Sequence, residues 1–134
     1  MFDQARAAAA LPAQDLERAK AFYRDKLGLT PIQEDQGGLL YELAKGTGFG
    51  VFLSSGQPSG THTQMAIEVD DLDKAVKELR ARGVKLEEYD TPFVKTVDGI
   101  GEIPNGQKVA WFKDSEGNLI GVGLPIRLAA RTRA

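Results

Sequence analysis

The sequence contains no cysteine, a single histidine and no long hydrophobic run. Without cysteine, neither a disulfide framework nor a thiolate metal site is available, and the composition suits a reducing compartment. No apolar segment reaches the roughly 18 residues that a transmembrane helix requires. Residues 1–6 lack the basic start and the apolar core of a secretory signal. We therefore expect a cytoplasmic protein that does not associate with membranes.

The sequence also lacks a strong net charge, because its 17 basic and 19 acidic residues give a formal charge of −2. Such a balance provides no broad attraction to nucleic acid. The 42% hydrophobic and 27% charged residues are typical of a globular protein. A chain of 134 residues corresponds to one domain that buries about two-thirds of its unfolded surface.

What the chain does contain is an internal repeat. The segment 15–19 (DLERA) recurs as 71–75 (DLDKA). In both segments the aspartate is placed as a helix N-cap, and apolar residues follow at the spacing of three and four that buries one side of a helix. Gly28 and Gly83 follow at positions where a glycine ends a helix. We predict helices from 16 to 27 and from 72 to 82.

Apolar runs around these helices predict four strands in each half of the chain. One strand precedes each helix and three follow it, at 7–11, 29–34, 39–43 and 49–54, and at 64–69, 84–89, 107–113 and 119–124. We expect a single domain over 1–134 with two βαβββ repeats, about 5–60 and 61–126, and a short basic tail at 127–134. The segment 90–106 has little periodicity, and we leave open whether it is a lid or a dimer contact.

Three segments resemble a known family. They are 15–29 (DLERAKAFYRDKLGL), 65–72 (MAIEVDDL) and 110–120 (AWFKDSEGNLI). In this order they resemble the vicinal oxygen chelate superfamily, which includes glyoxalase I, extradiol dioxygenases and bleomycin-resistance proteins. The resemblance implies an α+β fold in which two βαβββ modules form an incompletely closed mixed β-barrel. The helices would lie outside and a cavity at the centre, and a homodimer commonly completes the barrel.

The resemblance also implies where a metal ion would bind. Metal-dependent members use four inward side chains, usually His, Glu or Gln, on the first and last strand of each module. The matching positions here are Ala8, Phe52, Gln64 and Gly121. A divalent ion needs several oxygen or nitrogen donors, and only Gln64 supplies one. We therefore expect no metal and no cofactor.

Small side chains should leave room where the metal ligands are missing. Strand alternation places Ala10, Gly50 and Glu68 on the same inward side as the four positions above. A roomy pocket with an apolar wall and few polar groups is typical of a small-molecule site. Six residues are predicted to bind the ligand: His62, Gln64 and Glu68 by orienting it, Phe52 and Trp111 by contact area, and Gly121 by leaving space.

Two of these residues allow more than one interpretation. Glu68 is either an unpaired buried carboxylate or the ion-pair partner of a neighbouring basic residue such as Lys113. His62 is either an acid/base group at the rim of the cavity or an ordinary loop histidine. No serine or cysteine partner for a catalytic triad is identified.

From these observations we predict a metal-free, homodimeric small-molecule-binding protein. It would sequester or carry a largely apolar ligand, for which an aromatic compound is one candidate. Two alternatives stay open. The first is a glyoxalase-type lyase, isomerase or dioxygenase that uses Glu68 or His62 as a general base, or a metal site at other residues. The second is a dimerising interaction module whose cavity is vestigial.

Overall fold

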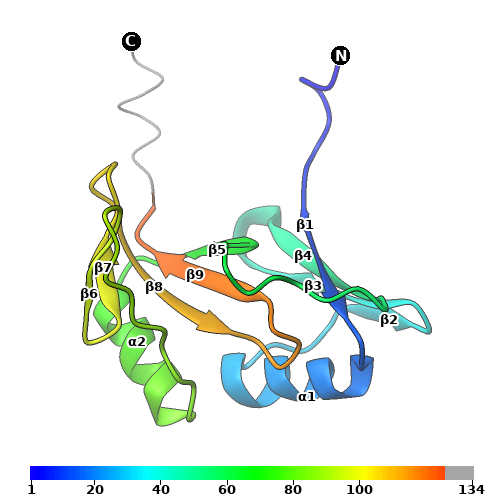
Figure 1. The fold of residues 1–134 in the computed structure, drawn as a ribbon. Coiled ribbons are helices and arrows are strands. Elements are labelled where there is room, and N and C mark those ends of the chain that lie inside the picture. Colours follow the sequence, from blue (N-terminus) through cyan, green and yellow to red (C-terminus); the bar gives the residue numbers. More distant parts are fainter. Residues whose placement is uncertain (126–134) are drawn as a thin grey trace. The chain divides into compact units, whose positions relative to one another are not determined.

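A computed structural model describes residues 1–125 of the chain, and the predicted basic tail at 127–134 lies outside the described residues. The chain forms two compact units (Figure 1). The first comprises residues 1–64 together with 114–118, and the second comprises 65–113 with the residues from 119 onward. No helix within residues 1–125 is long and apolar enough to span a membrane.

The first unit is a four-stranded mixed sheet with one α-helix. Its elements are β1 (Ala9–Ala13), α1 (Leu16–Leu27), β2 (Gln33–Asp35), β3 (Gly38–Glu42), the short 3-10 helix η1 (Ala44–Gly46) and β4 (Gly48–Leu53). The strand order is β1-β4-β3-β2. The strands β1 and β4 pair in parallel, and the other neighbours are antiparallel. This is the predicted βαβββ module.

Local signals define both ends of α1. The Oδ1 atom of Asp15 accepts a hydrogen bond from the backbone N–H of Arg18 at 3.0 Å, which satisfies one free donor of the first turn. Gly28 adopts a left-handed conformation with φ 69° and ends the helix. These are the cap residues predicted from the sequence.

Aromatic side chains form the core of the first unit beneath α1. Tyr23 of the helix is fully buried, and its ring lies 5.3 Å from that of Tyr41 and 5.4 Å from that of Phe49, measured between centroids. The rings of Tyr41 and Phe49 stack at 4.9 Å. Aromatic pairs at such distances add to the free energy gained by burial alone.

The second unit repeats this topology in a five-stranded mixed sheet. Its elements are β5 (Met65–Glu68), α2 (Leu72–Ala81), β6 (Thr96–Val97), β7 (Ile100–Glu102), β8 (Lys108–Lys113) and β9 (Leu119–Gly123). The strand order is β5-β9-β8-β7-β6. As in the first unit, the strand that precedes the helix, β5, pairs in parallel with the last strand in sequence, β9. The two-module α+β fold is therefore confirmed, and each of its sheets is open.

One predicted strand is wrong. Residues 84–89 form no strand, and Leu86 makes only an isolated bridge with Phe112. The strands β6 and β7 come instead from the segment 90–106, where no strand was predicted. The carboxylate of Glu88 anchors this hairpin, because its Oε1 accepts from Thr96 Oγ1 at 2.6 Å and from the Gly99 N–H at 3.0 Å.

Candidate functional site

Strand register divides the side chains of the first sheet between two faces. On one face Leu11, Val51 and Leu39 stand side by side and are buried. The opposite face presents two rows that α1 does not cover (Figure 1). The register defines these rows as Ala10–Gly50–Leu40–Gln33 and Pro12–Phe52–Gly38–Asp35.

A groove of about 290 Å³ lies on this second face. The groove has depth because the residues at its base, Ala10 and Gly50, are small. A Cβ atom added at Gly50 would meet only the Leu39 carbonyl oxygen, at 3.7 Å, so open space lies above it. Leu40 and Phe52 stay 43% and 41% exposed. The full lining is Ala10, Gln33, Asp35, Gly37, Gly38, Leu39, Leu40, Gly50, Val51 and Phe52.

The polar groups of this groove come from β2. Gln33 supplies an amide, and Asp35 supplies a carboxylate whose Oδ1 accepts from the Gly37 N–H at 2.8 Å. The lining contains no basic side chain and no serine, cysteine or histidine. The groove can therefore bury apolar surface and accept hydrogen bonds from a ligand.

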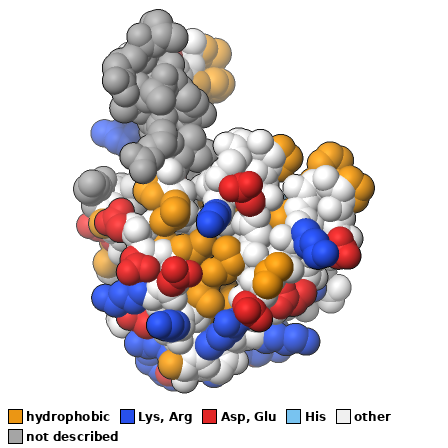
Figure 2. All heavy atoms as spheres, turned by 90° about the vertical axis from the view of Figure 1, so that its left-hand side faces the viewer, with side chains coloured by type: hydrophobic (Ala, Val, Ile, Leu, Met, Phe, Trp, Pro, Cys, Tyr) orange, Lys and Arg blue, Asp and Glu red, His pale blue; other side chains and the backbone are white. Residues whose placement is uncertain are grey.

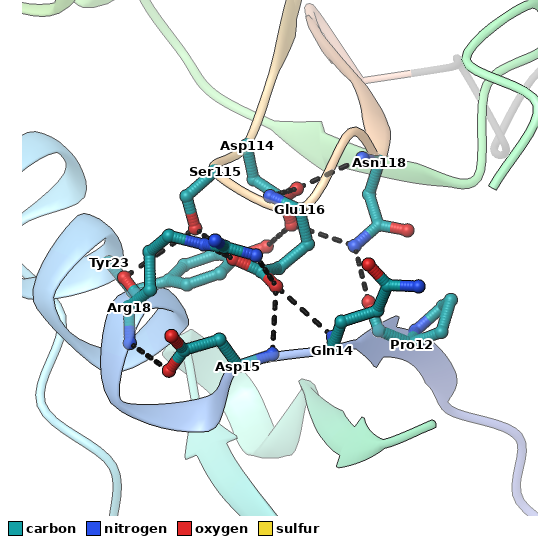
Figure 3. A network of polar contacts seen from close by, with 9 residues as sticks. All are labelled: Pro12, Gln14, Asp15, Arg18, Tyr23, Asp114, Ser115, Glu116 and Asn118. Carbon is teal, nitrogen blue, oxygen red and sulfur yellow. Dashed lines mark hydrogen bonds and ion pairs between the residues drawn. The ribbon is translucent and has the colours of Figure 1, made fainter. Parts of the chain in front are cut away.

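A polar network holds the end of β1, next to the groove (Figure 3). The Nδ2 atom of Asn118 donates to the Pro12 carbonyl oxygen at 2.9 Å. The backbone N–H groups of Gln14 and Asp15 both donate to Glu116 Oε1 at 3.1 Å. Pro12 stands beside Phe52 in the sheet, so these bonds fix the strand that borders the groove.

Asp114 is the centre of this network and is only 6% exposed. Its Oδ2 accepts from Tyr23 Oη at 2.7 Å and from Asn118 Nδ2 at 2.9 Å. Its Oδ1 accepts from the backbone N–H groups of Glu116 and Asn118, each at 2.9 Å. Four donors thus satisfy a buried carboxylate, as such a charge requires. Burial and, next, the negative charge of Asp114 raise the pKa of Tyr23 above its ordinary value.

Glu116 forms the second ionic contact of the network. Its carboxylate accepts from Arg18 Nε at 2.8 Å and from Arg18 Nη2 at 2.9 Å, and Figure 3 shows the guanidinium reaching from α1 toward the turn. This hydrogen-bonded pairing is the main reason that the pKa of Glu116 is lowered to about 2. The bond from Ser115 Oγ, at 2.8 Å, lowers the pKa further.

The residues at the family's metal positions do not fit a metal ion. Ala8, Phe52 and Gly121 have no donor side chain. Gln64 is half-buried, and its Oε1 finds no hydrogen-bond partner among the described residues. Within 1–125 no group of three or more His, Cys, Asp or Glu residues is placed to hold an ion. One amide oxygen cannot replace the several donors that a divalent ion needs.

The structure places His62 in a local turn. Its Nδ1 lies 2.9 Å from Ser59 Oγ, and that oxygen lies 2.9 Å from Thr61 Oγ1. All three residues are outside the lining of the groove. This arrangement matches the loop-histidine interpretation and gives His62 no contact with the groove.

Glu68 and Trp111 differ from what the sequence indicated. Glu68 is exposed rather than buried, and the ion-pair partner of Lys113 is Glu87, at 3.8 Å. Trp111 is 7% exposed and packs in a hydrophobic cluster of the second unit, with its ring 5.5 Å from that of Tyr89. Its ring is therefore a core group in this unit, because Tyr89, Val94 and Ile103 cover the hydrophobic face on which it lies.

Of the six predicted ligand residues, only Phe52 lines the groove of the first unit. Ala10 and Gly50, which alternation placed inward, also line it. Leu40, Gln33 and Asp35 are not among the predicted residues, because their position on this face follows from cross-strand register, which no single strand reveals. Leu39 and Tyr41 are buried, and strand alternation places Leu40 between them on the opposite face. This alternation is the signal that could have identified Leu40 as a groove residue.

The sequence matches the Glyoxalase/Bleomycin resistance protein/Dioxygenase superfamily over residues 6–122. The chain therefore belongs to this superfamily, which confirms the vicinal oxygen chelate resemblance. No curated protein matches the sequence closely enough to be counted as a relative.

Solved structures share the fold at low sequence identity. A bleomycin-binding protein complexed with bleomycin has a TM-score of 0.70 at 19% identity, with 90% of this chain and 98% of that chain covered. A bleomycin resistance determinant encoded on transposon Tn5 has a TM-score of 0.69 at 19% identity, covering 89% and 96%. Lactoylglutathione lyase from Agrobacterium tumefaciens has a TM-score of 0.66 at 21% identity, covering 92% and 96%.

Proposed function

We propose that the protein binds a small organic molecule on the open face of the β1–β4 sheet and does so without a metal ion. The observation that carries this proposal is the groove in which Gly50 leaves space between the exposed side chains of Leu40 and Phe52. Apolar surface that is removed from water contributes about 25 cal/mol per Å², so a ligand that covers both side chains gains affinity from their burial.

The lining defines the chemistry of the ligand. Phe52 and Leu40 favour a largely apolar, aromatic molecule that can lie flat on a floor of small residues. Asp35 and Gln33 at one rim accept hydrogen bonds, and the carboxylate favours a ligand with a donor or a positive charge at that end. An anionic ligand would find no basic partner in this lining.

Two further findings favour binding over catalysis. Three of the four metal positions of the superfamily have no donor side chain in this chain, and the groove lining contains no serine, cysteine or histidine. Among the structural neighbours, one is described as a bleomycin-binding protein complexed with bleomycin. By analogy with that protein, the function proposed here is to sequester or carry a compound without converting it.

The proposal includes a cytoplasmic homodimer. The family resemblance favours a dimer that completes the barrel, and the first unit exposes Ile32 and Leu53 at 59% and 53% in addition to the groove residues. Apolar residues on such a surface favour association. Sedimentation equilibrium tests the dimer, and a monomer at all concentrations would contradict this part of the proposal.

A thermal-shift screen with aromatic metabolites and antibiotics tests the binding function. A ligand at 100 times its Kd adds about 2.7 kcal/mol to the free energy of unfolding. For each hit, Gly50→Leu should fill the groove and abolish the shift, since a Cβ atom there makes only an ordinary contact with the Leu39 carbonyl oxygen. Gly56→Leu is the matched control, because this exposed glycine lies outside the lining. If hits bind Gly50→Leu as tightly as the unaltered protein, the groove is not the site.

A further inference from the structure

The second unit has a larger groove, of about 780 Å³, which the proposed function does not use. It lies between the N-terminus of α2 and the strands β6, β7 and β8. Its apolar part is made by Leu72, Val97, Ile100 and Leu124. Val97 is 67% exposed, an unusual state for a valine within a strand. Figure 2 views the molecule from the side of α2, β6 and β7, where hydrophobic side chains form an area bordered by acidic and basic ones.

Carboxylates outnumber basic groups around this groove. Asp70, Asp71, Asp73 and Glu102 line it, against two lysines. Asp71 caps α2, since its Oδ1 accepts from the Lys74 N–H at 3.0 Å. For Asp70, Asp73 and Glu102, the described part of the chain shows no ion pair. The groove therefore combines an apolar floor with an acidic rim whose charges are available to a partner.

The chain segment that follows Leu124 has a composition complementary to that of the groove. Leu124 lines the groove, and residues 126–134 (IRLAARTRA) begin two positions later. This segment contains Arg127, Arg131 and Arg133, no acidic side chain, and the aliphatic residues Ile126 and Leu128. Fully extended, nine residues reach about 30 Å, which is ample for a groove of this volume.

We propose that residues 126–134 dock in this groove of their own chain, with the arginines at the acidic rim and the aliphatic side chains on the apolar floor. The short connection gives the segment a high effective concentration at the groove, which a free peptide lacks. Docking would bury the side chain of Val97, which is otherwise exposed on β6.

Limited trypsin digestion of the full chain tests the docking. Mass spectrometry would follow cleavage after Arg127, Arg131 and Arg133, with a free peptide of residues 122–134 as the reference. A docked segment is cut only when it opens, so we expect the full chain to be cut at these sites about tenfold more slowly than the peptide. Equal rates in the chain and in the peptide would overturn the proposal.

Matched variants identify the groove as the docking site. Val97→Ser and the double variant Asp73→Asn/Glu102→Gln should speed cleavage, whereas Phe93→Ser and Glu78→Gln should not. Phe93 is 74% exposed and Glu78 is exposed on α2, and neither lines the groove. If the controls speed cleavage equally, the effect is not due to the groove.

A substitution within residues 126–134 leaves the groove and the folded second unit unaltered. Leu128→Ser should speed cleavage after Arg131, and an unchanged rate would contradict the role of the apolar floor. The digestion is repeated at several protein concentrations. Protection that grows with concentration would assign the groove to the segment of a second copy and would overturn docking within one chain.

Discussion

Tyr23 and Asp114 meet through a hydrogen bond of 2.7 Å between the tyrosine hydroxyl and the carboxylate. Tyr23 belongs to α1, and Asp114 begins the turn that joins β8 to β9, so residues 91 positions apart form one buried polar pair. The same carboxylate orders the turn around it, and through Asn118 the turn holds the Pro12 carbonyl next to the groove.

Removal of the Tyr23 hydroxyl should destabilise the protein. Tyr23→Phe takes one donor from a buried carboxylate, and we expect the free energy of unfolding to fall by about 1–3 kcal/mol. Tyr41→Phe is the matched control, because the Tyr41 hydroxyl is also buried but has no hydrogen-bond partner among residues 1–125. Urea denaturation compares the two variants. A larger loss for Tyr41→Phe would contradict the importance of the Asp114 bond.

Acid should weaken the Glu116 contact. The pKa of Glu116 in the folded protein, about 2, lies below its ordinary value, so the folded state favours the charged form. This contribution is present above pH 5 and is lost as the pH falls from about 5 toward 2. One proton limits the slope to about 1.4 kcal/mol per pH unit. The stability gap between the unaltered protein and Glu116→Gln should therefore narrow across this range.

Two neighbouring glycines of β4 should respond differently to alanine. A Cβ atom at Gly48 would collide with the Tyr41 carbonyl oxygen, which is backbone and cannot move aside. We expect Gly48→Ala to cost about 1–3 kcal/mol. Gly50→Ala should be nearly neutral, since its Cβ would meet only an ordinary contact at 3.7 Å. Thermal melts of both variants measure the two losses of stability. Equal losses would argue against this pairing of β3 with β4.

Chelation should not affect the protein. Since three of the four family metal positions lack donors, we expect the Tm with and without EDTA to agree within about 1 °C. Millimolar zinc, nickel, manganese or iron(II) should give no stabilisation above that of magnesium. Elemental analysis of protein purified without chelator provides the independent measurement. A stoichiometric transition metal would contradict metal-free binding.

The helices could be predicted well because their signals are local. Asp15 and Asp71 bond to backbone groups three residues away, and Gly28 adopts the left-handed conformation that ends α1. Each interaction lies within a few residues of sequence, so a reading of the chain finds it. The duplicated topology followed from the spacing of the two caps.

The strands of the second unit were harder to predict, because alternation reports burial and not pairing. Val84 and Leu86 alternate with polar residues and are each 7% exposed, yet the segment is not a strand. The true hairpin turns at Asp98-Gly99, with φ of 53° and 83°. An Asp-Gly pair is a strong hairpin signal, but here it lies within a segment whose low periodicity indicates no flanking strands.

The groove could be predicted only in part. Ala10, Gly50 and Phe52 were placed on the inward face, but Trp111 was expected to contact the ligand and is instead packed in the core. Whether an aromatic ring lines a groove or lies in the core depends on which residues pack against it. For Trp111 these are Tyr89, Val94 and Ile103, which come from a part of the chain without a clear periodicity. The central cavity expected from the family resemblance stays a prediction.

The turn at 114–118 makes the first unit discontinuous in sequence. A fragment that ends at residue 64 would lack Asp114, Glu116 and Asn118, and its Tyr23 hydroxyl and Pro12 carbonyl would have only solvent as partners. Although the topology is repeated along the chain, the first repeat depends on a turn that lies within the second. Circular permutants that keep this turn intact, and not half-length fragments, are the sound starting point for engineering this protein.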